Sequence, residues 1–249
     1  MQFARIPKLI AHRGYARNYP ENTLPAIQAA VGAGARFVEF DVQLSRDRVP
    51  VLLHDHDLVR TGGRPDCVWD LSATELSRVS VGEARRFGSR YSAVCVPSLA
   101  EIVEWWQDQP QLTAFVEFKE ESLQRFGYRS MLEIVVKVLQ PVSDRTTVIS
   151  RNTNLIATAR RMAGLSVGWV MPAWDSATHR AAIAGSPDYL FCNWRRFPPN
   201  NAPLWDGMWS WVAYEVADPQ QALALAQRGV EYVETMAIGE MLKHPLFQV

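Results

Sequence analysis

The segment Arg36-Phe37-Val38-Glu39-Phe40-Asp41-Val42 decides how the rest of the chain is interpreted. Side chains alternate between the two faces of a β-strand, so the apolar residues at 38, 40 and 42 share one face and the carboxylates Glu39 and Asp41 share the other. An ordinary amphipathic strand would turn these carboxylates toward solvent. In a closed barrel the same face would be the interior, so the interpretation depends on the strands around it.

Short apolar runs alternate with stretches of helical period along the whole chain, which indicates β-α units. The predicted strands are Lys8–His12, Arg36–Asp41, Thr113–Phe118, Thr147–Ser150, Val167–Met171, Tyr189–Asn193, Trp211–Val216 and Glu231–Thr235. Most of them precede a helix-like stretch, and eight such units predict an α/β fold of the (β/α)8 or TIM barrel type. A length of 249 residues suits a single barrel domain over residues 1–249.

Local signals place the first helix and a long insertion. Asn22 is expected to cap a helix that buries Leu24, Ile27 and Val31 and that Gly32 and Gly34 end. Between the second and third barrel strands, two capping-box patterns mark further helices, namely Ser72 with Glu75 and Ser98 with Glu101. The absence of a clear barrel strand in this stretch predicts an inserted subdomain at about 57–97 on the C-terminal rim, where barrel active sites lie.

Composition excludes several classes of protein. The chain has 26 Lys plus Arg, 26 Asp plus Glu and 48% hydrophobic residues, which argues against disorder and against a nucleic-acid partner. No run of about 18 apolar residues predicts a transmembrane helix, and the charged, proline-containing start does not resemble a signal peptide. Three scattered cysteines favour a reducing compartment. We therefore expect a cytoplasmic protein; its oligomeric state stays open.

Paired carboxylates on one strand face need compensation. Two carboxylates about 4 Å apart repel by about 4 kcal/mol at an effective dielectric near 20, against a domain stability of about 5–15 kcal/mol. One divalent metal ion, Mg²⁺ or Ca²⁺, is the economical solution, and a shared proton is the alternative. Glu117 on the next strand can join Glu39 and Asp41 as a third ligand, because parallel strands lie about 4.8 Å apart. Lys119 would bind an anionic oxygen or form a salt bridge to Asp41 or Glu117.

Two histidines follow apolar runs at the ends of predicted strands, His12 after residues 9–11 and His54 after residues 51–53. One such histidine is more often a structural residue. Two of them beside three inward carboxylates favour acid-base catalysis, which needs a pKa near neutrality. Arg13 and Gly14 add a planar cation and a backbone that allows close approach, which suit a phosphate. Together these residues predict metal-assisted attack at phosphorus.

The order and spacing of short motifs over residues 9–119 resemble those of the glycerophosphodiester phosphodiesterase family. The matching pieces are His12-Arg13-Gly14, Pro20-Glu21-Asn22-Thr23, Glu39-x-Asp41, Pro50-Val51 to His54-Asp55, Leu58 to Thr61, Asp70-Leu71-Ser72 with Glu75-Leu76, Val96-Pro97-Ser98-Leu99 and Glu117-Phe118-Lys119. The resemblance implies a barrel with a small insertion that hydrolyses glycerophosphodiesters, its small-molecule substrates, to glycerol 3-phosphate and an alcohol.

Site roles also follow from the resemblance. It implies metal ligation by Glu39, Asp41 and Glu117, acid-base catalysis by His12 and His54, and phosphate binding by Arg13 and Lys119. In the mechanism usually proposed for the family, the glycerol 2-hydroxyl attacks phosphorus, a cyclic phosphate forms and water opens it. Related activities toward lysophospholipids or sphingolipids, and a silent phosphodiester-binding barrel, are the alternatives.

The resemblance weakens beyond Ser150. Arg151, the stretch Tyr214-Glu215-Val216-Ala217 and Met236 stand where many family members carry other residues. These departures leave the metal and acid-base set intact and concern the pocket around the substrate. Tryptophans concentrate in the same half of the chain, at 194, 205, 209 and 211. They would pack the barrel and its rim loops or form an aromatic wall for a choline-like cation or a greasy chain.

Overall fold

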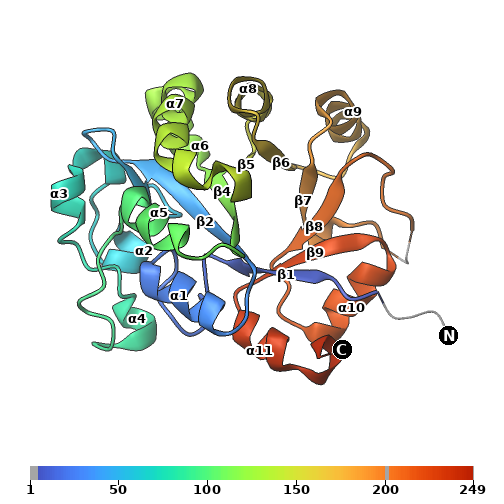
Figure 1. Ribbon diagram of the computed structural model, residues 1–249, viewed down its shortest axis with the longest axis horizontal. Coiled ribbons are helices and arrows are strands. Elements are labelled where there is room, and N and C mark those ends of the chain that lie inside the picture. The colour runs from blue at the N-terminus through green and yellow to red at the C-terminus, as the bar shows by residue number, and fades with distance from the viewer. Residues whose placement is uncertain (1–4, 200–201, 249) are drawn as a thin grey trace.

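The computed structural model describes residues 5–199 and 202–248 and shows a closed barrel (Figure 1). Nine strands form one sheet, which closes through the pairing of β1 with β2. All neighbouring pairs are parallel except β2 with β3, so the barrel wall consists of eight parallel strands. The predicted TIM barrel is confirmed.

All eight predicted barrel strands are present, and their ends lie within three residues of the predicted ends. They are β1 (Lys8–His12), β2 (Phe37–Leu44), β4 (Thr113–Phe118), β5 (Thr146–Ser150), β6 (Ser166–Val170), β7 (Tyr189–Asn193), β8 (Ser210–Tyr214) and β9 (Val230–Thr235). The short strand β3 (Pro50–Leu52) folds back antiparallel along the end of β2. This return brings the chain to His54 beside the C-terminal ends of the barrel strands.

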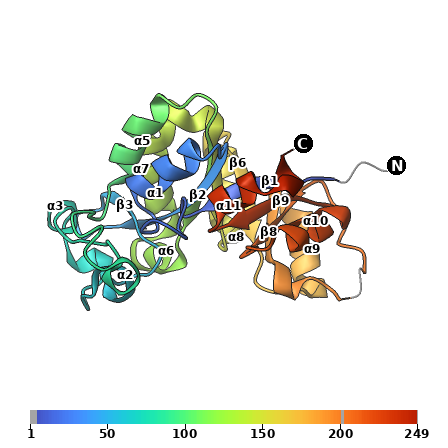
Figure 2. The ribbon, with the colours of Figure 1, turned by 90° about the horizontal axis from the view of Figure 1, so that it is seen from below.

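Helices surround the barrel on its outside (Figure 2). They are α1 (Leu24–Gly32), α5 (Leu99–Gln107), α6 (Glu120–Phe126), α7 (Tyr128–Leu139), α8 (Thr153–Ala163), α9 (Ser176–Gly185), α10 (Pro219–Gln227) and α11 (Ile238–Lys243), with 3-10 turns η2 (Gln140–Arg145), η3 (Trp194–Arg196) and η4 (Pro245–Phe247). Within the described ranges no helix has both the length and the apolar character needed to cross a membrane.

The chain between β3 and α5 forms a group of short elements beside β2 (Figure 1). They are α2 (Val59–Gly62), η1 (Val68–Asp70), α3 (Ala73–Leu76) and α4 (Ala84–Phe87). Their buried side chains, among them Leu58, Leu76 and Val96, form a cluster separate from the main core. Both predicted capping boxes are present, one at the start of α3 and one at the start of α5.

The start of α1 differs from the prediction. Thr23, not Asn22, is the N-cap residue, and its Oγ1 accepts a hydrogen bond from Ala26 N at 3.3 Å. Asn22 adopts a left-handed backbone conformation with φ of 54°. Its side chain instead turns to β2, where Nδ2 donates to Asp41 Oδ2 at 2.8 Å and Oδ1 accepts from Asp41 N at 3.0 Å. The prediction was wrong because a carboxylate far along the chain competes for the same amide.

Between β7 and β8, the described residues contain the turn η3 and an irregular segment in place of a barrel helix. Aromatic rings fill this position. Trp174 stacks on Trp205 with ring centroids 4.0 Å apart, and its centroid lies 5.6 Å from that of Trp211. Phe197 packs edge-on against Trp174 at 5.7 Å. Trp209 and Trp211 are buried in the main core, so the packing interpretation of the tryptophans is supported.

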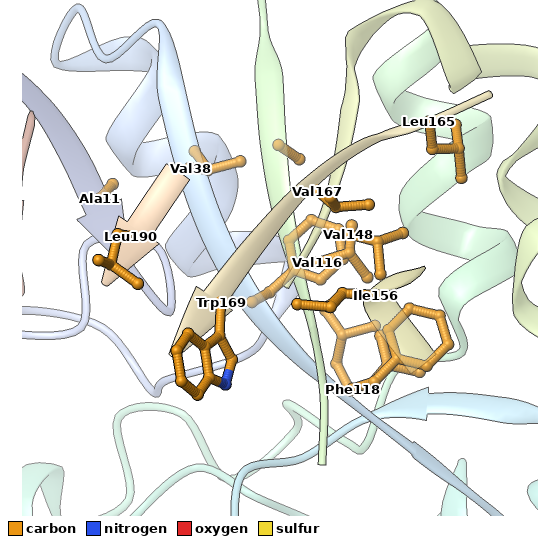
Figure 3. Packing of buried hydrophobic residues seen from close by; sticks show 14 of the residues in the cluster. Ala11, Val38, Val116, Phe118, Val148, Ile156, Leu165, Val167, Trp169 and Leu190 are labelled. Carbon is orange, nitrogen blue, oxygen red and sulfur yellow. The ribbon is translucent and has the colours of Figure 1, made fainter. Parts of the chain in front are cut away.

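The alternation of side chains divides the apolar residues into two layers. One layer lies between the barrel wall and the helices, and Figure 3 shows part of it, with Val38, Val116, Val148 and Trp169 in one packed cluster. The other layer fills the barrel interior. It contains Ile10, Phe115, Ile149, Val170, Phe191, Val212 and Tyr232. Above this apolar plug, toward the C-terminal strand ends, the inward positions become polar.

Candidate active site

Three carboxylates converge at the C-terminal mouth of the barrel. Glu39, Asp41 and Glu117 each offer an oxygen, and these oxygens lie within 4.8 Å of one another. Strand register explains the convergence, because Asp41 on β2 pairs directly with Glu117 on β4, and Glu39 is the preceding inward position of β2. Three oxygen donors at this spacing suit a hard divalent cation.

The two carboxylates of β2 have opposite electrostatic surroundings. Burial raises the pKa of Glu39 well above its ordinary value, and the neighbouring Asp41 raises it further. Burial also acts to raise the pKa of Asp41, but Lys119 and Arg13 outweigh burial and lower it. Lys119 Nζ lies 3.2 Å from Asp41 Oδ1 and 3.3 Å from Glu117 Oε1. Asp41 is therefore the ionised member of the pair in the metal-free chain.

Unfilled hydrogen-bonding capacity accompanies this cluster. Glu39 Oε1 is buried and accepts no hydrogen bond from the described residues, and the buried Asp41 Oδ1 has the ammonium group of Lys119 as its neighbour. Buried carboxylate oxygens normally have partners. An unpartnered oxygen of Glu39 beside the oxygens of Asp41 and Glu117 fits a site for a cation that completes their coordination.

Arg13 and Gly14 form a tight turn immediately after β1. Arg13 has a left-handed φ of 57°, its N–H donates to Glu39 Oε2 at 3.0 Å, and its Nε lies 3.2 Å from Asp41 Oδ2. A Cβ on Gly14 would lie 2.6 Å from the backbone carbon of Ala26. The backbone at Gly14 therefore packs directly against helix α1, with no room for a side chain. It places Arg13 over the carboxylates.

A continuous series of ionic contacts connects Arg13 to His54. Glu21 Oε1 accepts from Arg13 Nη1 at 2.9 Å, and both oxygens of Glu21 accept from Arg60 at 2.7 Å. Arg60 Nε also donates to Asp55 Oδ2 at 2.7 Å, and Asp55 Oδ1 lies 2.7 Å from His54 Nδ1. The inserted segment, which contributes Arg60, therefore takes part in orienting both the imidazole and the guanidinium.

His12 lies at the end of β1 between two carboxylates. Its Nε2 is 3.8 Å from Glu39 Oε2 and 3.9 Å from Glu234 Oε2. Burial, followed by the charge of Arg13, lowers the pKa of His12 well below its ordinary value. The ring is thus neutral near pH 7 and able to accept a proton.

All seven predicted site residues lie in this region, and five of them line one pocket of about 110 Å³. The lining residues are His12, Arg13, His54, Glu117, Lys119, Ile149, Arg151, Val170, Phe191, Tyr214, Glu215 and Glu234. Glu39 and Asp41 lie buried next to it, in contact with Arg13. Arg151, Tyr214 and Glu215, which depart from the family pattern, form part of the pocket wall.

Sequence reasoning missed four residues that complete the site. Glu21, Asn22 and Arg60 hold predicted residues in place through the hydrogen bonds described above. Glu234 is 4% exposed and lies inward on β9, and burial together with Glu117 and Asp41 raises its pKa well above the ordinary value. The alternation of side chains along β9 could have predicted Glu234, because it places Glu234 on the same face as Tyr232, which lies in the barrel interior.

Comparisons with known proteins agree with this geometry. The model of the glycerophosphoryl diester phosphodiesterase family matches residues 12–194. A Caldanaerobacter subterraneus subsp. tengcongensis protein named glycerophosphodiester phosphodiesterase is 30% identical over 191 residues, covering 73% of this chain and 76% of that protein. A Bacillus altitudinis protein of the same name is 32% identical over 145 residues, 58% of each chain. The match thus spans little more than half of that relative.

Solved structures share the fold. The Oleispira antarctica phosphodiesterase in complex with the product sn-glycerol-3-phosphate has a TM-score of 0.80 at 24% identity and covers 95% of both chains. A Silicibacter pomeroyi structure described as a putative glycerophosphoryl diester phosphodiesterase has a TM-score of 0.82 at 22% identity, with 96% of this chain and 93% of that chain covered.

Proposed function

Because the chain belongs to the glycerophosphoryl diester phosphodiesterase family, a family of phosphoric diester hydrolases, we propose that it hydrolyses glycerophosphodiesters to glycerol 3-phosphate and an alcohol with the help of a divalent metal ion. One observation carries the proposal: the three clustered carboxylates and the two histidines, His12 and His54, meet at one pocket. A binding scaffold would need the charges of this pocket and would not need two proton carriers.

The residues present fit a metal ion. Glu39, Asp41 and Glu117 would hold it, since their oxygens lie within 4.8 Å of one another and Oε1 of Glu39 is buried without a hydrogen-bond partner among the described residues. A bound Mg²⁺ or Ca²⁺ ion supplies positive charge against the negative charge that grows on the phosphoryl oxygens. Arg13 and Lys119 bind the phosphate from the same side. Both stay charged, because neighbouring carboxylates raise the pKa of each cation although burial acts to lower it.

The histidines carry protons at the two ends of the reaction. One takes the proton of the glycerol 2-hydroxyl as its oxygen bonds to phosphorus, and the other donates a proton to the alcohol as the bond to it breaks. A cyclic phosphate results, and water then opens the ring with the proton transfers reversed. Asp55 orients His54 through the 2.7 Å contact with Nδ1. The free cysteines Cys67, Cys95 and Cys192 support a location in the reducing cytoplasm.

The test uses the full chain, stripped of metal with a chelator and then supplied with Mg²⁺ or Ca²⁺. Release of glycerol 3-phosphate from glycerophosphocholine and glycerophosphoethanolamine is measured. We expect metal-dependent turnover that falls at least 10³-fold in His12→Ala and in His54→Ala. His244→Asn is the matched control, because His244 lies in the C-terminal region beyond α11. Absence of turnover on any phosphodiester, with metal demonstrably bound, would contradict the proposal.

A further inference from the structure

Glu234 lines the pocket, yet the proposed metal site and phosphate contacts leave it without a role. It is 4% exposed and its Cα pairs with that of Ile10 across β9 and β1. Its Oε1 is buried and has no hydrogen-bond partner among the described residues. Its Oε2 lies 3.9 Å from His12 Nε2, beyond hydrogen-bonding distance.

A buried carboxyl group of this kind is costly unless a partner satisfies it. Among the residues that the structure describes, no arginine or lysine forms an ion pair with Glu234. Its charged neighbour is His12. Glu215, which also lines the pocket, differs in this respect, because its Oε2 accepts from Asn193 at 2.8 Å and from Arg195 at 3.2 Å. Glu234 therefore keeps a hydrogen-bonding position for a molecule that enters the pocket.

Size and surroundings identify the part of the substrate concerned. The cavity of about 110 Å³ is small and admits a small polar group. Ile149, Val170 and Phe191 belong to the apolar interior and close its floor. The glycerol moiety is small and present in every substrate of the proposed class, whereas the esterified alcohols vary in size and need an open exit. A three-carbon polyol fits a closed floor that offers one hydrogen-bonding carboxyl group.

We infer that Glu234 binds the terminal hydroxyl group of the glycerol moiety, the hydroxyl farthest from phosphorus. The inference rests on the proposed function and deepens it by assigning the residue that selects glycerol. The position of Glu234 beside His12 adds a consequence. When the terminal hydroxyl of glycerol is held by Glu234, the adjacent 2-hydroxyl lies near His12. Glu234 would then contribute both to the choice of glycerol and to the position of the attacking hydroxyl.

The experiment compares two substrates. One is glycerophosphoethanolamine, and the other is its analogue with propane-1,2-diol in place of glycerol, which keeps the attacking hydroxyl and lacks the terminal one. We expect the wild-type enzyme to prefer the glycerol substrate by about 10- to 100-fold in kcat/KM, as for a hydrogen bond to a buried charged or polar group. In Glu234→Leu, kcat/KM for the glycerol substrate should fall to the value for the analogue. The variant should change kcat/KM for the analogue itself by less than about threefold.

Two further variants serve as matched comparisons. Glu234→Gln keeps an acceptor oxygen and should retain most of the preference. Glu215→Gln removes the other carboxylate of the same wall and should leave the preference within about twofold. Should Glu234→Leu fail to fold, Glu234→Ala replaces it, and the wild-type preference is itself an independent measurement. Circular dichroism verifies the fold of each variant.

Several outcomes would overturn the inference. Equal losses on both substrates in Glu234→Leu would show that Glu234 acts through His12 or the fold. A loss on glycerophosphoethanolamine without a loss on glycerophosphoglycerol would place the carboxyl group against the amine of the leaving alcohol. Equal wild-type rates on glycerol substrate and analogue would refute glycerol selection and leave the proposed function intact. Failure to hydrolyse any diester would instead refute the proposed function.

Discussion

Replacement of Glu21 by glutamine tests the series of ionic contacts that joins Arg13 to His54. Glu21 is 5% exposed and accepts one hydrogen bond from Arg13 and two from Arg60. Glutamine keeps the size of the side chain and removes its charge. Both guanidinium groups then lose a carboxylate, and the amide presents N–H groups to cations that cannot accept hydrogen bonds.

The expected loss follows from these contacts. A hydrogen bond to a charged group contributes about 1.5–3 kcal/mol and a neutral one about 1 kcal/mol. The Arg13 side chain is 12% exposed, so its bond to Glu21 should lose the full difference between a charged and a neutral hydrogen bond. The Arg60 side chain is 42% exposed, so solvent screens its two bonds and their loss counts for less. We expect the free energy of unfolding to fall by about 2–3 kcal/mol, a decrease in Tm of roughly 4–12 °C for a chain of this length. Since Arg13 loses its orientation, kcat/KM should fall about 10- to 100-fold.

Urea and thermal unfolding of the metal-free chain measure the stability, and glycerol 3-phosphate release measures activity. Asp66→Asn is the control, because Asp66 forms an ion pair with Arg64 on the exposed surface, and it should change neither quantity measurably. Burial acts to raise the pKa of Glu21, but Arg60 and Arg13 lower it below 4.5. The stability from Glu21 is therefore present above about pH 4.5 and lost as the pH falls through the lowered pKa. A Glu21→Gln variant as stable and active as Asp66→Asn would refute this reasoning.

Three other predictions address the metal site and the barrel. Addition of Mg²⁺ or Ca²⁺ near neutral pH should release protons, because burial and Asp41 raise the pKa of Glu39 and the ion binds the carboxylate; calorimetric heats that are equal in two buffers of different ionisation enthalpy would contradict this. Asn22→Leu should cost about 1–3 kcal/mol, since Asp41 loses two hydrogen bonds, and should weaken metal binding in titrations. Trp174→Ala should lower the unfolding free energy by about 2–4 kcal/mol with kcat/KM within twofold of wild type, because Trp174 packs with Trp205 away from the pocket.

The alternation of side chains along strands made much of this architecture predictable. The same pattern that places Val38 in the outer layer turns Glu39 into the barrel, and parallel register then brings Asp41 level with Glu117. These relations depend on local geometry and on neighbouring strands, which sequence patterns record well. The barrel and the set of carboxylates follow from them.

Long-range choices between chemically equivalent partners were not predictable. Asn22 can cap a helix or bind a carboxylate with the same amide, and the left-handed turn that directs it to Asp41 depends on packing between β1 and α1. Glu21 and Arg60 are 39 residues apart, with α1, β2 and β3 between them, so they pair only in the folded chain. The segment between β7 and β8 lacks helical period, and its contribution becomes clear only when Trp205 is seen stacked on Trp174.

The neutral charge of the chain conceals an imbalance at the barrel mouth that links metal, protons and substrate. The inward carboxylates are Glu39, Asp41, Glu117 and Glu234, and the cations beside them are Arg13 and Lys119. Four acids against two bases leave a formal charge of −2 before any ligand binds. Burial and the neighbouring carboxylates raise the pKa values of Glu39 and Glu234, which favours the protonated form of each group. We expect a divalent ion to displace the proton of Glu39 as it binds, because a metal ligand must be deprotonated.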